Sequence, residues 1–230
     1  MKKNLLIALS LLLSNAAFSQ MSGDYNYSLA VRGYSIMQMP KILNQKKNES
    51  FKDVAFNGGM IKFNDNQISY RLGGSYIKRD VKLINECATC EEANGKVKDF
   101  NFSIGFEKNL NFSRIQPYFG FDIGFRDNNF DGILVSKNAL ASKGDVLGPD
   151  GVEARKTGFT AAPVIGIKVN PLPWVTLFAE SSMQWFYAYE RQETVAQDAE
   201  NTRTVNKYYK SEFLLNAVSV GLQVNIGSSR

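Results

Sequence analysis

Strict alternation of apolar and polar residues between Phe100 and Arg126 limits the fold more than any other feature of the sequence. Every second residue is large and apolar from Phe100 to Phe106, and again from Phe119 to Phe125. The residues between them are small, polar or charged. A period of two over runs of this length is typical of strands, so the segment is predicted to form a strand, a turn and a second strand. Such a hairpin suits a soluble sheet and equally a membrane barrel whose apolar face meets lipid.

The same alternation recurs along the rest of the chain. It predicts six further strands, at residues 27–37, 54–63, 68–76, 159–169, 175–187 and 218–226. In the second of these the pattern slips at Gly58-Gly59, where a bulge would keep Phe56, Ile61 and Phe63 on one face. Short turns are predicted near Asp65, Asn111 and Pro171, and long polar loops at 40–50, 84–96, 127–156 and 191–210. Short and long connections that alternate in this way are typical of outer-membrane barrels.

The polarity of the two strand faces indicates which side meets lipid. Charged residues do not interrupt the middle of the apolar faces, where they would cost about 2–4 kcal/mol against lipid. They gather on the opposite face, as Arg32, Arg71, Glu107, Asp122, Arg126, Lys168 and Glu180. A soluble ligand barrel would show the reverse pattern, apolar inside and charged outside. The fold class is therefore predicted to be all-β, an eight-stranded antiparallel up-and-down transmembrane β-barrel with short periplasmic turns and long outer loops.

Aromatic residues are concentrated near the predicted strand ends. Tyr70, Tyr118 and Trp174 lie beside the short turns, and Tyr76, Trp185, Tyr187 and Tyr189 lie towards the long loops. Two such groups resemble the aromatic girdles that membrane barrels place at the two interfaces.

The N-terminus is predicted to be a cleavable secretory signal. Lys2 and Lys3 precede an apolar run from Leu5 to Leu13, and small residues follow at Ala17 and Ser19. The run is far shorter than the ~20 residues of a spanning helix; a buried N-terminal helix is the alternative. Residues 1–19 are thus assigned to the signal, with cleavage between Ser19 and Gln20, and residues 20–230 to one outer-membrane barrel domain. Loss of the two lysines lowers the formal charge from +5 to +3, too small an excess to indicate nucleic-acid binding.

The sequence resembles the small outer-membrane β-barrel proteins of Bacteroidota, which are similar in architecture to the OmpA transmembrane domain. The resemblance rests on Phe18-Ser-Gln20 at the end of the signal, on the strand Pro117-Tyr-Phe-Gly-Phe-Asp-Ile-Gly-Phe125, and on residues 166–180, which contain Asn-Pro-Leu-Pro-Trp. It implies location in the outer membrane, contact with outer-membrane lipid and a porin-like fold. The chain ends in Gly-Ser-Ser-Arg rather than in the terminal aromatic of proteobacterial barrels.

Two short motifs could form a redox or metal-binding site. Cys87-Ala-Thr-Cys90 is interpreted as a loop disulfide in an oxidising compartment, with redox or metal use as the alternative. Asp127, Asn129 and Asp131, followed by Gly132, match the first half of a calcium loop, but Asn138 replaces its final glutamate. Turn chemistry explains the same residues, so no metal or cofactor site is assigned.

Histidine is absent, which excludes histidine-based catalysis and histidine metal sites. Eight strands enclose little more than their own side chains, and mixed charges in so narrow a lumen favour internal ion pairs over a channel. The leading hypothesis is a non-enzymatic envelope protein with a plugged lumen, which binds a protein or surface ligand through its loops. A small pore or transport accessory subunit is the first alternative, and a secreted soluble ligand-binding barrel the second.

Overall fold

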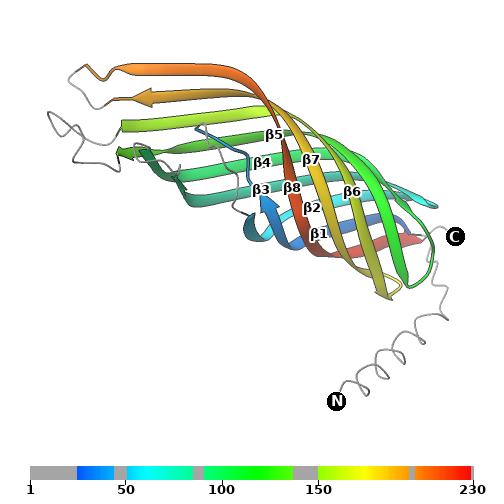
Figure 1. Cartoon of the computed structure of the whole chain (residues 1–230). Helices are drawn as coiled ribbons and strands as arrows, with labels where there is room; N and C mark the ends of the chain where they lie inside the picture. The colour runs from blue at the N-terminus through cyan, green and yellow to red at the C-terminus, as the bar shows by residue number, and fades with distance from the viewer. Residues whose placement is uncertain (1–24, 44–50, 85–90, 137–149, 197–199, 229–230) are drawn as a thin grey trace, which may run out of the picture.

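The computed structural model describes residues 25–43, 51–84, 91–136, 150–196 and 200–228. They form eight antiparallel strands in a closed ring, each hydrogen-bonded to the next and β8 to β1 (Figure 1). The strands are β1 (Tyr25–Gln38), β2 (Phe51–Asp65), β3 (Ile68–Ile84), β4 (Glu91–Asn109), β5 (Ile115–Ser136), β6 (Asp150–Leu172), β7 (Val175–Val195) and β8 (Arg203–Ser228). The predicted eight-stranded antiparallel barrel is confirmed. Within the described residues, no helix is long and apolar enough to cross a membrane.

The short connections lie at one end of the barrel, as predicted. They join β2 to β3 at residues 66–67, β4 to β5 at 110–114, and β6 to β7 at 173–174. Asn66 adopts the left-handed conformation (φ 53°) that asparagine tolerates in tight turns. The C-terminus lies at this same end (Figure 1). That this end faces the periplasm stays a prediction.

Three of the predicted long loops are mostly strand. In 84–96, β4 already begins at Glu91; in 127–156, β5 runs to Ser136 and β6 begins at Asp150; in 191–210, β7 runs to Val195 and β8 begins at Arg203. Sequence reasoning took these stretches for loops because they are polar. In the described parts of these stretches most inward residues are apolar, such as Ala93, Phe130 and Val152, although Asn128 and Lys156 are buried as well.

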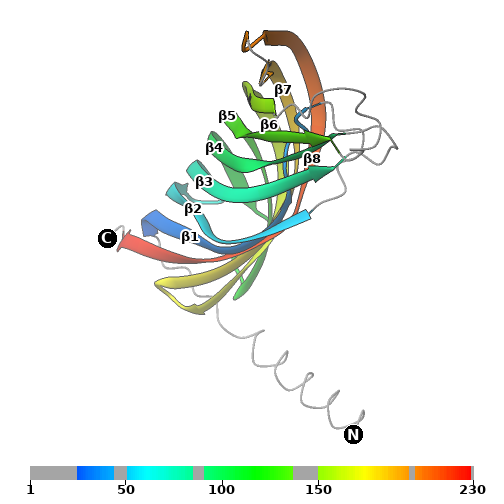
Figure 2. The ribbon, with the colours of Figure 1, turned by 90° about the vertical axis from the view of Figure 1, so that its left-hand side faces the viewer.

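Six strands continue past the closed ring. The last pairs that β1 and β2 make with their outer neighbours are Met37–Asn216 and Gly58–Ser75. Beyond them β3–β8 form a curved open sheet, which we call the strand extension: residues 77–84, 91–99, 127–136, 150–157, 190–195 and 203–210. Figures 1 and 2 show this sheet projecting from the end of the barrel opposite the short turns.

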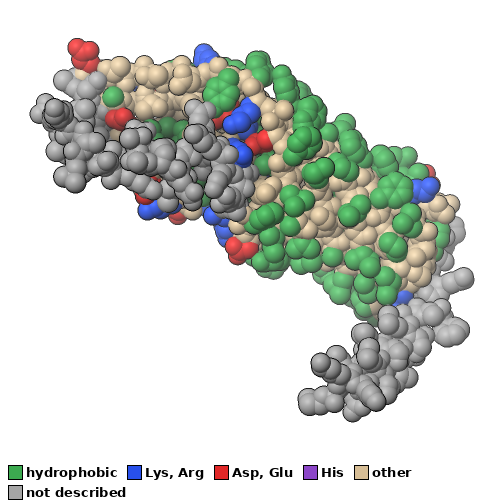
Figure 3. Space-filling model, viewed as in Figure 1, with side chains coloured by type: hydrophobic (Ala, Val, Ile, Leu, Met, Phe, Trp, Pro, Cys, Tyr) green, Lys and Arg blue, Asp and Glu red, His purple; other side chains and the backbone are tan. Residues whose placement is uncertain are grey.

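Inside and outside polarity invert between the ring and the extension. In the ring, outward side chains such as Ile123 (60% exposed) are apolar and inward ones such as Asp122 are buried and charged. In the extension, Phe130 points inward and is fully buried, while its outward neighbours Asn129 and Asp131 are polar and Lys98 and Arg155 flank Asn129. Figure 3 shows the apolar belt giving way to a mixed polar surface along the same strands. This is the polarity of strands that leave lipid and enter water.

The extension has a small apolar core, closed by the segment after β1. Phe130 packs there with Ile42 and with Ala93, Val97, Val152 and Ala154. We call residues 39–43 the hook, because they fold over the concave face of the extension and bury Ile42 to 2% exposure.

A bulge shifts the β1–β2 register between Arg32 and Tyr34. On β2, Phe56 (φ 50°) and Asn57 together lie opposite the single residue Gly33 of β1. Phe56, Ile61 and Phe63 all face outward, as the predicted bulge requires, although it lies just before Gly58. Period-two alternation with the inward Arg32 predicts a lumenal Tyr34, but that prediction is wrong, because the shift turns Tyr34 outward (40% exposed).

Candidate functional site

Glu107 on β4 is the centre of a buried charge cluster in the lumen. Its carboxylate accepts hydrogen bonds from Lys62 Nζ at 2.9 and 3.0 Å and from Arg71 Nη1 at 3.2 Å, and it pairs with Lys168 Nζ at 2.5 Å. Glu107 and Lys62 have no exposed side-chain surface. A buried carboxylate is tolerated in such a place only because its oxygens meet several cationic donors.

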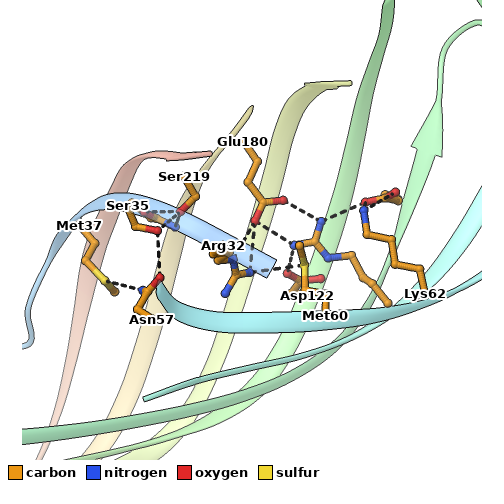
Figure 4. Close-up of polar contacts among 12 residues, drawn as sticks. Arg32, Ser35, Met37, Asn57, Met60, Lys62, Asp122, Glu180 and Ser219 are labelled. Carbon is orange, nitrogen blue, oxygen red and sulfur yellow. Dashed lines mark hydrogen bonds and ion pairs between the residues drawn. The ribbon is translucent and has the colours of Figure 1, made fainter. Parts of the chain in front are cut away.

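Arg71 joins Glu107 to a second carboxylate, Glu180 on β7. Its guanidinium lies 3.1 Å from Glu180 and 3.0 Å from Asp122 on β5. Arg32 pairs with Glu180 at 3.2 Å from the other side, so a chain of ion pairs crosses the lumen (Figure 4). We call the set Arg32, Lys62, Arg71, Glu107, Asp122, Lys168 and Glu180 the lumen cluster.

Two aromatic rings fill the lumen beside this cluster, each against a glycine on the neighbouring strand. Tyr118 faces Gly166 and Phe178 faces Gly221 in the strand pairing. The Tyr118 hydroxyl donates to Glu180 at 3.1 Å, and Lys62 Nζ lies 5.8 and 5.6 Å from the Tyr118 and Phe178 ring centres. Tyr118 was predicted to belong to an interfacial girdle. That prediction is wrong, because the ring points inward and is 2% exposed.

A Gly166→Ala substitution tests this ring packing. A Cβ at residue 166 would lie 2.3 Å from Tyr118 Cζ, so the ring must move and its hydrogen bond to Glu180 must change. We expect a loss of about 1–3 kcal/mol in the free energy of unfolding, typical of overpacking. Urea unfolding in detergent micelles measures it. Gly74→Ala is the matched control, since its Cβ would meet nothing within 4 Å; equal losses in both variants would contradict the packing.

A second ion pair closes the lumen nearer the extension. Arg126 on β5 lies 2.5 Å from Asp99 on β4 and donates to Gln184 Oε1 at 2.6 Å. Between this pair and the lumen cluster lies a polar cavity of about 60 Å³, lined among others by Asn57, Ser103 and Thr160. This volume holds on the order of four water molecules.

A third charged group fastens the hook. Lys156 Nζ pairs with Glu212 at 2.5 Å and with Glu190 at 3.8 Å, and it donates to the carbonyl of Lys41 at 3.1 Å. The Lys41 amide in turn donates to Glu212 at 3.2 Å. Nearby, burial and the charge of Glu190 raise the pKa of the Tyr208 phenol.

The predicted lumenal charges all point inward, but they form two groups. Six of them lie in the lumen cluster, whereas Arg126 pairs separately with Asp99. Sequence reasoning did not single out Lys62, Asp99 or Lys156. For Lys62 a signal was available, because it alternates with the outward Ile61 and Phe63.

The remaining predicted sites have no lumenal role in the structure. Cys87, Cys90, Ser19 and Gln20 lie outside the described residues. Asp127, Asn129 and Asp131 belong to an extended part of β5, not to a loop.

The Asp127 carboxylate accepts from Arg155 at 3.0 Å and from Thr157 at 2.5 Å. Burial alone would raise the pKa of the Asp127 carboxyl, but these hydrogen bonds and the charge of Arg155 outweigh it and hold the pKa below its usual value. Among the described residues no group of three or more acidic or sulfur ligands is placed to hold a metal.

The fold is shared with outer-membrane β-barrel proteins. The structure is similar to OprG from Pseudomonas aeruginosa, with a TM-score of 0.57 and 10% identity over 90% of this chain and 99% of that one. It is also similar to a major outer-membrane protein from Thermus thermophilus, with a TM-score of 0.51 and 10% identity over 87% and 99% of the two chains. The sequence itself matches no known protein family and no curated protein.

Proposed function

We propose that this chain is a non-enzymatic outer-membrane protein whose closed barrel anchors the strand extension at the cell surface. The extension would bind a protein or surface ligand and so serve an envelope structural or interaction role. One observation carries the proposal: a buried charge cluster crosses the lumen, while six strands continue past the closed ring with a core of their own.

The outward apolar belt supports the membrane location. Side chains such as Ile123, Ile165 and Phe159 are 60–71% exposed in the ring, where water contact would be costly and lipid contact is favourable. The same belt argues against a secreted soluble barrel, which would carry its apolar residues inside. The filled lumen likewise argues against a transport role.

Impermeant labelling tests the orientation on which this function rests. Single cysteines at Lys82 in the extension and Lys108 near the short turns would be compared in a chain with Cys87 and Cys90 replaced by serine. We expect a membrane-impermeant maleimide to label Lys82→Cys in intact cells and Lys108→Cys only after the envelope is opened. Labelling confined to Lys108→Cys would show the opposite orientation and contradict the proposed role.

Cross-linking tests the interaction itself. A photoreactive residue at Lys82 should cross-link one reproducible partner in intact cells, and the same residue at Tyr70, which faces the lipid belt near the other end, should not. Cross-links from Tyr70 alone, or the same products from both positions, would remove the support for binding through the extension.

A further inference from the structure

Five cations form one continuous row across the outward face of the strand extension. The strand pairing aligns Lys78 with Lys98, Lys98 with Asn129, Asn129 with Arg155, Arg155 with Arg191, and Arg191 with Lys207. All six side chains point outward. Ile77, Val97, Asn128, Ala154 and Glu190, the chain neighbours of five of them, are buried inside, and Tyr208 beside Lys207 bonds to the buried Gln192. We call these six residues the cationic row.

Like charges in this row oppose one another directly. Lys78 faces Lys98, and Arg191 has Arg155 on one side and Lys207 on the other. Facing residues on neighbouring strands have Cβ atoms about 4.5–5.5 Å apart, and like charges at that distance destabilise a sheet. A partner with the opposite charge would relieve this repulsion.

Within the described chain the row is only partly neutralised. Arg155 pairs with Asp127 at 3.0 Å and Arg191 with Glu193 at 2.8 Å. None of the ion pairs among the described residues includes Lys78, Lys98 or Lys207. The uncompensated positive charge therefore lies at the two ends of the row.

The row lies immediately beyond the apolar belt. At one end of the row, Tyr76 and Phe100 face each other, two residues along the strands from Lys78 and Lys98. At the other end, Tyr189 and Tyr209 lie two residues from Arg191 and Lys207, and their ring centres are 5.3 Å apart. Residues two apart in a strand are about 7 Å apart. The cations thus lie at the depth of lipid headgroups, directly above exposed aromatic rings of the kind found at membrane interfaces.

Apart from Asp127, which lies in the aromatic row and pairs with Arg155, the nearby outward carboxylates are held one step further from the belt. The next row of outward residues contains Asp80, Lys96, Asp131, Glu153 and Glu193. Cations near the membrane and carboxylates away from it are the order that a negatively charged membrane surface favours, since lysine and arginine near such a surface are attracted to it.

We propose that the cationic row binds the phosphate groups of anionic lipid headgroups in the leaflet that meets the strand extension. Lys78 with Lys98 forms one end of this site, and Arg191 with Lys207 the other. The proposal goes beyond the surface-binding role above and needs only that the barrel spans a membrane.

Lipid selection by the purified full chain tests the site. The wild type is placed in nanodiscs of phosphatidylcholine with a minor share of phosphatidic acid, and the lipids that stay bound after detergent extraction are measured by native mass spectrometry. We expect enrichment of phosphatidic acid in the wild type and a fall of at least about fivefold in the triple variant Lys78→Gln, Lys98→Gln, Lys207→Gln.

The control variant Lys82→Gln, Lys96→Gln, Arg203→Gln removes the same charge further from the belt and should bind like the wild type. Equal loss in both variants, or no enrichment in the wild type, would overturn the proposal. If the row variant does not fold, the test uses the wild type alone. Its enrichment of phosphatidic acid should then fall as the salt concentration is raised, and enrichment that does not depend on salt would overturn the proposal. Phosphatidic acid that stays bound when inorganic phosphate is added at matched ionic strength supports a lipid site. Complete displacement of the lipid by inorganic phosphate would overturn the proposal. A barrel without lipid preference would still insert in phosphatidylcholine, so the proposed function is tested separately.

Discussion

Glu107→Gln is expected to destabilise the barrel by about 3–5 kcal/mol, the usual cost of removing one partner from a buried ion pair. Glu107 is the single carboxylate within ion-pair distance of Lys62 among the described residues, and neither side chain is exposed. The substitution leaves Lys62 charged and buried, and it removes the group that separates Lys62 from Arg71 and Lys168. Urea unfolding of refolded protein in lipid vesicles, followed by tryptophan fluorescence, measures the effect.

Two further variants make this result specific. Glu153→Gln removes an outward, exposed carboxylate from β6 and should change stability by no more than about 0.5 kcal/mol. Adding Lys62→Met to Glu107→Gln removes the stranded ammonium and should restore part of the loss, with a coupling of roughly 0.5–3 kcal/mol. Strict additivity of the two substitutions would show that the 2.9 Å contact has no energetic role.

Planar-bilayer recording is expected to show no steady conductance for the wild type. The lumen is crossed by side chains that are nearly or fully buried, including Arg71, Glu107 and Glu180, and by the rings of Tyr118 and Phe178. The double variant Tyr118→Ala, Phe178→Ala should conduct. Each ring lies over a glycine, so its removal leaves no Cβ on the facing strand to fill the space.

The matched control removes two rings from the lipid face. Tyr70 and Phe121 are 55% and 40% exposed on the outside of the ring, and Tyr70→Ala, Phe121→Ala should remain as silent as the wild type. Large, steady steps from the wild type would make the pore hypothesis correct. Silence of the lumenal double variant, with its fold intact, would mean that the charged side chains alone close the lumen.

The sequence predicted the ring well because lipid and lumen impose opposite demands on alternate residues. Phe119, Phe121, Ile123 and Phe125 read as one face with no structural knowledge, and Asp122 as the other. Prediction failed where a backbone irregularity changes the period, as at Tyr34, and where a ring near a strand end points inward, as Tyr118 does. A bulge is a local event whose position depends on the partner strand, which alternation along one chain does not contain.

The extension was missed for a related reason. Beyond Asp127, β5 places Phe130 inside and the polar Asn129 and Asp131 outside, so a search for a continuous apolar outward face stops there. The ion-pair partners in the lumen cluster could not be predicted from the sequence either, because Arg71 and Glu180 are 109 residues apart and meet only across the closed ring. Inward direction can be read from alternation, but the pairing across the lumen depends on shear and stagger of all eight strands.

The hook sets the order in which the molecule can assemble. Ile42 follows the first strand, yet its neighbours Phe130 and Val152 belong to β5 and β6, and Lys41 is held by Glu212 of the last strand. The hook follows directly on the end of the β1–β8 pairing, where Met37 pairs with Asn216 and Gln38 accepts a hydrogen bond from the Leu215 amide. Contacts between such distant parts of a chain form late and slowly. We therefore expect the extension to complete its core late in folding, after β1 has paired with β8.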